Sequence, residues 1–360
     1  MKQRQRIISW DVIRTVAILL VLICHATEAC YPMLAKNWSA MAFTSQIFRT
    51  VGFTAGRLGV PIFLFLSGGL LLTKKMENDE DCLSFYKRNL LPLFITCEIW
   101  ICLYNIFLAV FNNTPFDFTL LIRNLLFLEP IPISHIWYIP TIIGLYLAIP
   151  FISAVLKRFS IKSMWIFMVI AVLFLFVVPA IDSTKRILGS DHTFFTIIDL
   201  GFSGGIYGVY LVLGYFLKNG LLKKIPAPLL AFIGTIAFGG TCIYQMWSYN
   251  VNRNYYVWYD FMGIVITATC IFEVLSRIDI SEKRKVVRAF FTKISVYSLG
   301  IYFLHKPIMM ILQRVFPLYG LHNPLRVMLL LSATFILSFI PVYFLCKIKP
   351  IGKLLFLAKE

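Results

Sequence analysis

Long apolar runs dominate this chain and recur from one end to the other. A helix needs about 20 mainly apolar residues to cross the hydrocarbon core of a bilayer. Because backbone polar groups in lipid must be satisfied within the protein, such runs predict membrane-spanning helices. Only 14% of the residues are charged, against about 25% in a typical soluble domain. The sequence therefore predicts an all-α integral membrane protein.

We expect a polytopic bundle of about ten transmembrane helices. The expected spans are residues 10–28, 52–73, 90–111, 134–156, 163–181, 200–217, 227–247, 256–275, 291–313 and 325–346. The polar stretches between them are short. We therefore expect residues 1–360 to form a single transmembrane domain with no appended soluble domain.

Basic residues indicate the orientation of these helices. The chain has a net charge of +17, and its lysines and arginines gather in alternate loops. Cytoplasmic loops of membrane proteins carry an excess of Lys and Arg, so the pattern predicts that both termini are cytoplasmic. No basic groove interleaved with aromatic residues is visible, so we expect no nucleic-acid partner.

The eight cysteines are scattered, and most lie within apolar runs. No CxxC pair, HExxH motif or Cys/His cluster occurs, and these are the patterns that predict metal sites. We interpret the cysteines as small apolar side chains and expect no metal ion.

The first expected span carries several ionisable side chains, and the main ones are Asp11, Arg14 and His25. Charges inside lipid are costly, so each is a candidate for function. Eleven helical steps return to within about 20° of the starting direction, so Arg14 and His25 share one helix face, about 16 Å apart along the axis. With a cytoplasmic N-terminus, Arg14 lies toward the cytoplasm and His25 toward the opposite side.

The residue types suit different tasks. Histidine is the natural general base near neutral pH, and the donor fork of arginine suits phosphates. Asp11 lies one turn before Arg14 and could hold its guanidinium. Two simpler interpretations stay open: Arg14 could snorkel to the interface, and His25 could make a hydrogen bond between helices.

Further polar residues fall in or near other spans. Arg57 and His305 lie within apolar runs, where they should face a cavity or a partner. His135 and Trp137 open the fourth span, where an interfacial aromatic belt explains them equally well. Just before the third span, the cytoplasmic segment carries Lys87 and Arg88, which could bind phosphates or simply obey the positive-inside rule.

Taken in order along the chain, these residues and the segments around them resemble the acyltransferase 3 family of bacterial membrane proteins. The most specific part is Arg14-x10-His25, which matches the family's Arg-x10-His signature in the first helix. Three supporting segments follow it along the chain, and they are residues 60–68 (VPIFLFLSG), 135–138 (HIWY) and 298–307 (SLGIYFLHKP). The resemblance is closest to the short membrane O-acetyltransferase branch.

The resemblance implies a function. It implies transfer of an acyl group, most simply acetyl, from cytoplasmic acyl-CoA to a hydroxyl of a cell-surface or lipid-linked glycan. It also implies a bacterial cytoplasmic membrane location. His25 would act as general base, or as a nucleophile that forms an acyl-histidine. Arg14 would handle the CoA donor and Asp11 would orient Arg14.

The resemblance also assigns the remaining candidates. Lys87 and Arg88 would bind the CoA head, although Asn89 and Leu91 occupy positions that are often basic in the family. The residues expected to line the acceptor site are Arg57, His135, Trp137 and His305. A secondary transporter that exports a small metabolite or lipid-linked sugar is the alternative. Many transporter folds contain inverted repeats, and none is evident here.

Overall fold

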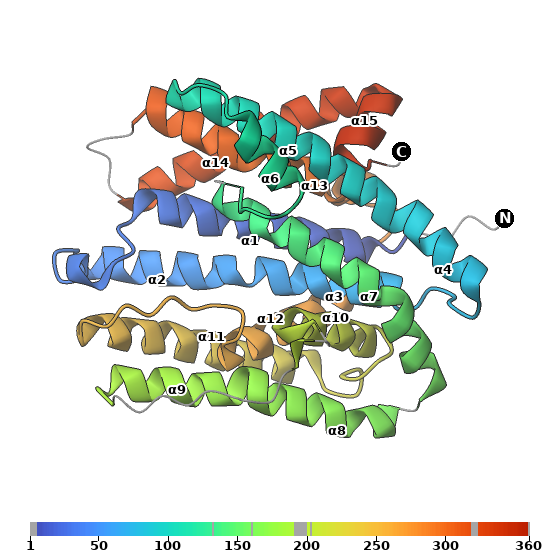
Figure 1. Ribbon diagram of the computed structural model, residues 1–360. Helices are drawn as coiled ribbons and strands as arrows, with labels where there is room; N and C mark the ends of the chain where they lie inside the picture. The colour runs from blue at the N-terminus through green and yellow to red at the C-terminus, as the bar shows by residue number, and fades with distance from the viewer. Residues whose placement is uncertain are drawn as a thin grey trace. The chain divides into compact units, whose positions relative to one another are not determined.

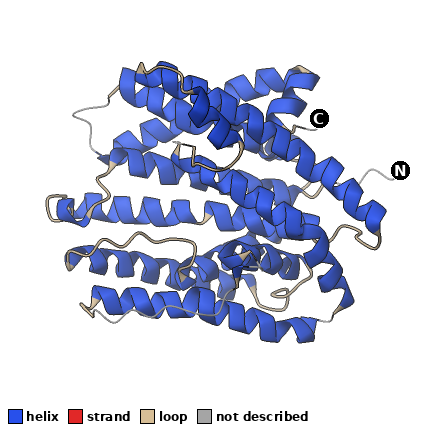
Figure 2. Ribbon diagram, viewed as in Figure 1, coloured by secondary structure: helices blue, strands red, loops and turns tan. Residues whose placement is uncertain are grey.

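The computed structural model describes residues 6–131, 133–159, 161–190, 200–201, 204–317 and 323–358. Within these ranges the regular secondary structure is entirely helical (Figure 2). This confirms the predicted all-α fold class.

Eight helical segments among the described residues are long and apolar enough to cross a membrane. They are Ile8–Cys30, Phe43–Leu71, Asp79–Asn112, Ser134–Arg158, Met164–Ile187, Ala227–Asn250, Lys285–Val315 and Asn323–Lys347. Two shorter apolar helices, Gly205–Lys218 and Met262–Ser276, coincide with the other two expected spans. The count of ten spans and the cytoplasmic location of both termini stay predictions.

Two helix boundaries differ from the sequence expectation. Helix α2 (Phe43–Arg57) begins well before residue 52 and continues almost directly into α3 (Gly59–Leu71) (Figure 1). Its early part is polar, but Arg49 and Thr50 are buried, so packing against protein sustains the helix there.

The expected span 256–275 also starts too early. Residues 251–261 form a loop, and α12 (Met262–Ser276) begins only after it. Asn252, just beyond the end of α11 (Ala227–Asn250), has a left-handed backbone with φ of 55°. The apolar residues of this segment are mostly aromatic and pack on neighbouring helices, which a hydropathy window does not distinguish from a span.

The described residues form two compact units. The first unit comprises Met1–Thr73, Leu156–Ser295 and Leu318–Leu331. It holds α1 (Ile8–Cys30), α2, α3, α8 (Ile161–Val172), α9 (Val178–Ile187), α10 (Gly205–Lys218), α11 and α12. Ile13, Ala17, Ile18 and Leu22 of α1 are fully buried. Helix α1 therefore supplies much of the core of this unit.

The second unit comprises Lys74–Val155, Val296–Pro317 and Ser332–Glu360. It holds α4 (Asp79–Phe85), α5 (Leu91–Asn112), α6 (Phe118–Leu125), most of α7 (Tyr138–Arg158) and α15 (Lys349–Phe356). The later parts of α13 (Lys285–Val315) and α14 (Asn323–Lys347) also belong to it. Helix α15 is fixed to α5, because Trp100 Nε1 donates to the Leu355 carbonyl at 2.8 Å.

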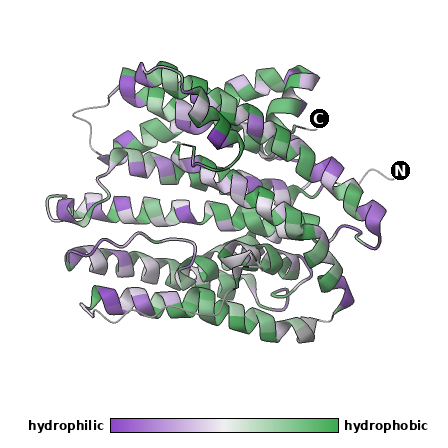
Figure 3. Ribbon diagram, in the orientation of Figure 1, coloured by the Kyte–Doolittle hydropathy of each residue, from purple (hydrophilic) through white to green (hydrophobic). Residues whose placement is uncertain are grey.

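Many helices turn large apolar side chains outward. Ile166 on α8 is 72% exposed and Ile243 on α11 is 69% exposed. Figure 3 shows hydrophobic residues along the middle of the helices and many hydrophilic ones toward their ends. In water such a surface would aggregate, whereas a bilayer accommodates it. The protein is a multi-pass membrane protein.

Candidate active site

One uninterrupted helix, α1, carries all three predicted residues of the first span, Asp11, Arg14 and His25. The helix extends to Cys30, beyond the expected end at residue 28. A further acidic side chain, Glu28, lies in the last turn of this helix. Glu28 lies three residues after His25, a spacing that places both side chains on one helix face.

His25 and Glu28 form the central pair of the site. His25 Nδ1 lies 2.8 Å from Glu28 Oε2. The two side chains are 12% and 27% exposed, respectively, so neither is sealed in the core. A carboxylate that accepts from Nδ1–H selects the tautomer of a neutral imidazole whose Nε2 carries the lone pair that can take up a proton. This is the arrangement that a general base requires.

Arg57 completes the cluster from the end of α2. Its Nη2 lies 3.3 Å from Glu28 Oε1, the oxygen that does not face His25. The two carboxylate oxygens therefore have different partners. Arg57 is 7% exposed, and a buried guanidinium beside a carboxylate holds that carboxylate in position.

The loop 251–261 packs on Arg57. The Arg57 guanidinium lies 4.5 Å from the centre of the Trp258 ring and 4.4 Å from that of Phe53. Its Nη1 donates to the hydroxyl of Tyr259 at 3.5 Å. Cation–π contacts of this kind are favourable once the cation is desolvated. Four neighbours thus fix Arg57 in one orientation.

Small residues let α2 approach α1 closely enough for these contacts. A Cβ atom added at Gly56 would lie 2.4 Å from the Cys24 Cβ, and one at Gly52 would lie 2.7 Å from Thr27 Oγ1. Glycines four residues apart are a common device for close helix packing in membranes. Gly56 immediately precedes Arg57, so the glycine contact and the ion pair set the same register.

At the other end of α1, Asp11 and Arg14 each contact a side chain of α13. Asp11 accepts from Arg6 Nε at 2.6 Å and Nη2 at 2.9 Å, and from Thr292 Oγ1 at 3.2 Å. Arg14 Nη1 donates to Ser295 Oγ at 3.5 Å. These contacts tie the start of α1 to the first turns of α13. Orientation of Arg14 by Asp11 remains a prediction.

His135 and His305 meet within the second unit, although they are far apart in sequence. Their ring centres are 4.7 Å apart, and they are 2% and 0% exposed. Tyr104 Oη lies 3.2 Å from His135 Nε2 and donates to the Phe303 carbonyl at 2.8 Å. Trp137 is half-buried and lies two residues after His135 in the same short helix. Contact of these side chains with a substrate remains a prediction.

Lys87 and Arg88 are exposed on a π-helical turn, Tyr86–Leu90, between α4 and α5. Asn89 of the same turn accepts a hydrogen bond from Lys74 Nζ at 2.8 Å. π-Helical turns often mark functional positions, and exposed cations can meet phosphates. The two side chains that we predict to contact CoA are therefore accessible.

The family comparison decides the class of protein. The family model described as an acyltransferase domain, that of the acyltransferase 3 family, matches residues 7–343. The chain belongs to the acyltransferase 3 family. No curated protein and no solved structure gives a significant match. As a member of this family the protein is a membrane acyltransferase, which disfavours the exporter alternative.

Within this acyltransferase, sequence reasoning missed Glu28 and the aromatic residues that hold Arg57. The signal for Glu28 was present as an i, i+3 spacing from His25, but it fell at the expected helix end. No local signal marks Trp258 or Tyr259, because a fold is needed to bring the loop 251–261 to α2. Among the described residues, no group of three His, Cys, Asp or Glu side chains could hold a metal ion.

Proposed function

We propose that this acyltransferase moves an acyl group, most simply acetyl, from cytoplasmic acyl-CoA to a hydroxyl of a cell-surface or lipid-linked glycan. It would act in the bacterial cytoplasmic membrane. The observation that carries the proposal is the 2.8 Å contact between His25 Nδ1 and Glu28 Oε2 on a membrane-spanning helix. A histidine whose second nitrogen is held by a carboxylate recurs in enzymes that activate a hydroxyl for acyl transfer.

In the proposed mechanism, His25 Nε2 takes the proton of the acceptor hydroxyl as its oxygen attacks the thioester carbonyl. The tetrahedral intermediate collapses, the carbon–sulfur bond breaks, and the imidazolium returns the proton to the CoA thiolate. Glu28 stabilises the transient imidazolium, as in the serine hydrolase triad. Arg57 is a positioning residue, because it acts through Glu28.

A second route uses His25 as the nucleophile. Nε2 would then attack the thioester carbonyl and expel CoA thiolate, and the acceptor hydroxyl would attack the acyl-imidazole. The two routes differ in one observable. Only the second leaves acyl label on His25 when acyl-CoA is supplied without acceptor.

The donor side of the proposal rests on basic residues. Arg14, on the predicted cytoplasmic half of α1, would hold the CoA phosphates or the thioester end, and Asp11 would support its orientation. Lys87 and Arg88 would bind the CoA head through their exposed charges. His135, Trp137 and His305 remain proposed contacts of the acceptor.

The test is mass spectrometry of surface glycans from cells with the gene, without it, and with His25→Ala. We expect loss of one acyl unit per modified repeat in both the deletion and the variant, with the variant protein still in the membrane. The matched control is Leu19→Ala, which truncates another half-buried side chain of α1. Full acylation in the His25→Ala strain would overturn the assignment.

A further inference from the structure

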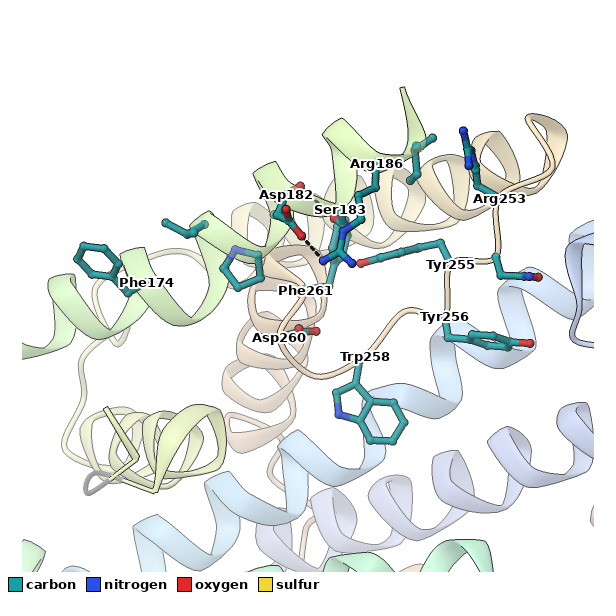
Figure 4. Close-up of a pocket in the computed structure, with 15 residues that line it drawn as sticks. Phe174, Asp182, Ser183, Arg186, Arg253, Tyr255, Tyr256, Trp258, Asp260 and Phe261 are labelled. Carbon is teal, nitrogen blue, oxygen red and sulfur yellow. Dashed lines mark hydrogen bonds and ion pairs between the residues drawn. The ribbon is translucent and has the colours of Figure 1, made fainter. Parts of the chain in front are cut away.

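A cavity of about 720 Å³ lies in the first unit, between α9 and the loop 251–261 (Figure 4). Its volume falls in the range of about 300–1,000 Å³ that is usual for ligand sites. Helix α9 contributes Asp182, Ser183 and Arg186, and the loop contributes Arg253, Tyr255 and other residues up to Phe261. His25, Glu28 and Arg57 do not line this cavity.

Side-chain contacts connect the loop that lines the cavity to its neighbouring helices. The Tyr255 ring packs edge-on against Tyr244 at 5.1 Å between centres. The Tyr244 hydroxyl in turn lies 2.9 Å from Ser183 Oγ on α9. On the other side of the loop, Asn254 Oδ1 accepts from the Ala35 backbone N–H at 2.7 Å. These contacts hold the loop on both sides and thereby define the walls of the cavity.

The polar groups of the cavity are balanced in charge. Asp182 is 2% exposed and forms an ion pair with Arg186 (Figure 4). Asp260 and Arg253 add one carboxylate and one guanidinium. Burial raises the pKa of the Tyr255 phenol, so this hydroxyl stays protonated and can donate at neutral pH. The lining therefore offers several donors and acceptors but no excess positive charge.

Aromatic rings supply the remaining surface. Tyr256 and Trp258 line the cavity on the side away from α9 (Figure 4). Aromatic rings with a polar tip provide large contact areas that suit a ligand with both apolar faces and hydroxyl groups. A sugar ring has this character: its C–H face packs on an aromatic ring while its hydroxyls bond to carboxylates, guanidinium groups and phenols.

Two other ligand classes fit the cavity less well. The CoA moiety carries several phosphates, which favour unpaired arginines and lysines, whereas here carboxylates accompany the arginines. A lipid chain requires an apolar lining. The smaller cavity between α8 and α10, of about 340 Å³, has that lining, with Val169, Leu213 and Phe216 among its residues.

Trp258 connects this cavity to the active-site cluster. The residue lines the cavity, and its ring is also the surface on which the Arg57 guanidinium rests at 4.5 Å. Arg57 contacts Glu28, and Glu28 contacts His25. A ligand in the cavity is thus separated from the proposed base by a short series of direct contacts. In the predicted topology, the C-terminal end of α9 and the loop 251–261 are extracytoplasmic, as is His25.

We propose that the cavity between α9 and the loop 251–261 binds a neutral sugar residue of the glycan acceptor. The proposal rests on the proposed function, in which a glycan hydroxyl receives the acyl group. It names the subsite that selects the acceptor and presents it to His25. Asp182, Asp260 and Arg253 would bond to sugar hydroxyls, and Tyr256 and Trp258 would pack on the ring.

The first experiment measures kinetics in proteoliposomes with acyl-CoA and deacylated surface-glycan fragments. Tyr256→Ala and Asp260→Asn should each raise the KM for the glycan by about tenfold, because each removes a ligand contact. The KM for acyl-CoA should stay unchanged. Lys185→Gln is the matched control, because Lys185 lies on α9 between lining residues but does not line the cavity. An increase confined to the KM for acyl-CoA, or no change in either KM, would overturn the proposal.

The second experiment is photolabelling with a diazirine-bearing alkyl hexoside. We expect label on residues 178–187 and 251–261, reduced by deacylated glycan fragments but not by acyl-CoA. Label elsewhere, or competition by acyl-CoA, would contradict the sugar site. If cavity labelling occurs but the His25→Ala strain keeps its glycan acylation, the proposed function fails and the sugar site stands. If acylation depends on His25 but the cavity is not labelled, the sugar site alone fails.

Discussion

The two histidine clusters of this protein differ in accessibility and in partners. The His25 side chain is 12% exposed and lies against the Glu28 carboxylate, whereas His135 and His305 are 2% and 0% exposed and lie among tyrosines. A general base must reach its substrate and must be stabilised when it becomes charged. The partial exposure of His25 and its contact with the Glu28 carboxylate satisfy both requirements. The comparison therefore favours His25 as the proposed general base.

The largest expected effect separates the two clusters directly. Loss of a general base typically costs about 10²–10⁴-fold in rate, so His25→Ala should lower kcat by that amount without changing the melting temperature greatly. His305→Ala should instead lower the melting temperature, because it empties a fully buried position. Initial rates and thermal unfolding of the two purified variants in detergent provide the measurements. A stable, inactive His305→Ala beside an active His25→Ala would reverse the comparison.

The next effect concerns the packing that places Arg57 beside Glu28. In Gly56→Ala the new methyl group would overlap Cys24, and overpacking costs about 1–3 kcal/mol. We expect a lower melting temperature and a lower kcat, because α2 must move away from α1. Gly144→Ala on α7 is the control, since an added Cβ there meets no atom within 4 Å. Equal behaviour of the two variants would show that the close approach is unimportant.

A smaller effect is expected within the second unit. Tyr104→Phe removes the hydroxyl that contacts His135 Nε2 and the Phe303 carbonyl. Loss of a buried hydrogen-bonded group costs about 1–3 kcal/mol, so the melting temperature should fall. Because we place the proton transfer elsewhere, kcat for the folded protein should stay near that of the wild type. A large fall in kcat with unchanged stability would indicate that His135 takes part in the reaction.

The smallest effect concerns the donor. Lys87→Gln and Arg88→Gln should raise the KM for acyl-CoA several-fold at low ionic strength and less at high salt, because exposed charges are screened. The KM for the glycan should not change. Initial rates at two salt concentrations test this prediction, with the exposed Lys283→Gln as the control. Unchanged KM values would remove these residues from the donor site.

Much of the fold could be predicted from the sequence, because a helix that crosses a bilayer needs a local run of apolar residues. Each expected span corresponds to a helix, and Arg14 and His25 do lie on one continuous helix. The predicted helix boundaries were wrong where the segment is surrounded by protein rather than by lipid. Helix α2 begins early because Arg49 and Thr50 are buried against protein, and the aromatic loop before α12 resembles a span in composition alone.

The site was less predictable, because its contacts join distant segments. Arg57 was selected as an ionisable residue at depth, but its partner Glu28 and its aromatic neighbours Trp258 and Tyr259 were not. Glu28 lies in the last turn of α1, at the end of the expected span, where a charged residue is ordinary and does not stand out as a candidate. The contact of Arg57 with Tyr259 joins residues about 200 positions apart, so no local pattern could reveal it.

The most direct test of the central claim is a double-mutant cycle on His25 and Glu28. The rates of His25→Ala, Glu28→Gln and the double variant are compared with the wild type, with acyl-CoA and deacylated glycan as substrates. If Glu28 acts through His25, the double variant should be no slower than His25→Ala alone, because groups that act as a unit are not additive. If the two losses multiply, Glu28 and His25 work independently and the account of the site is wrong.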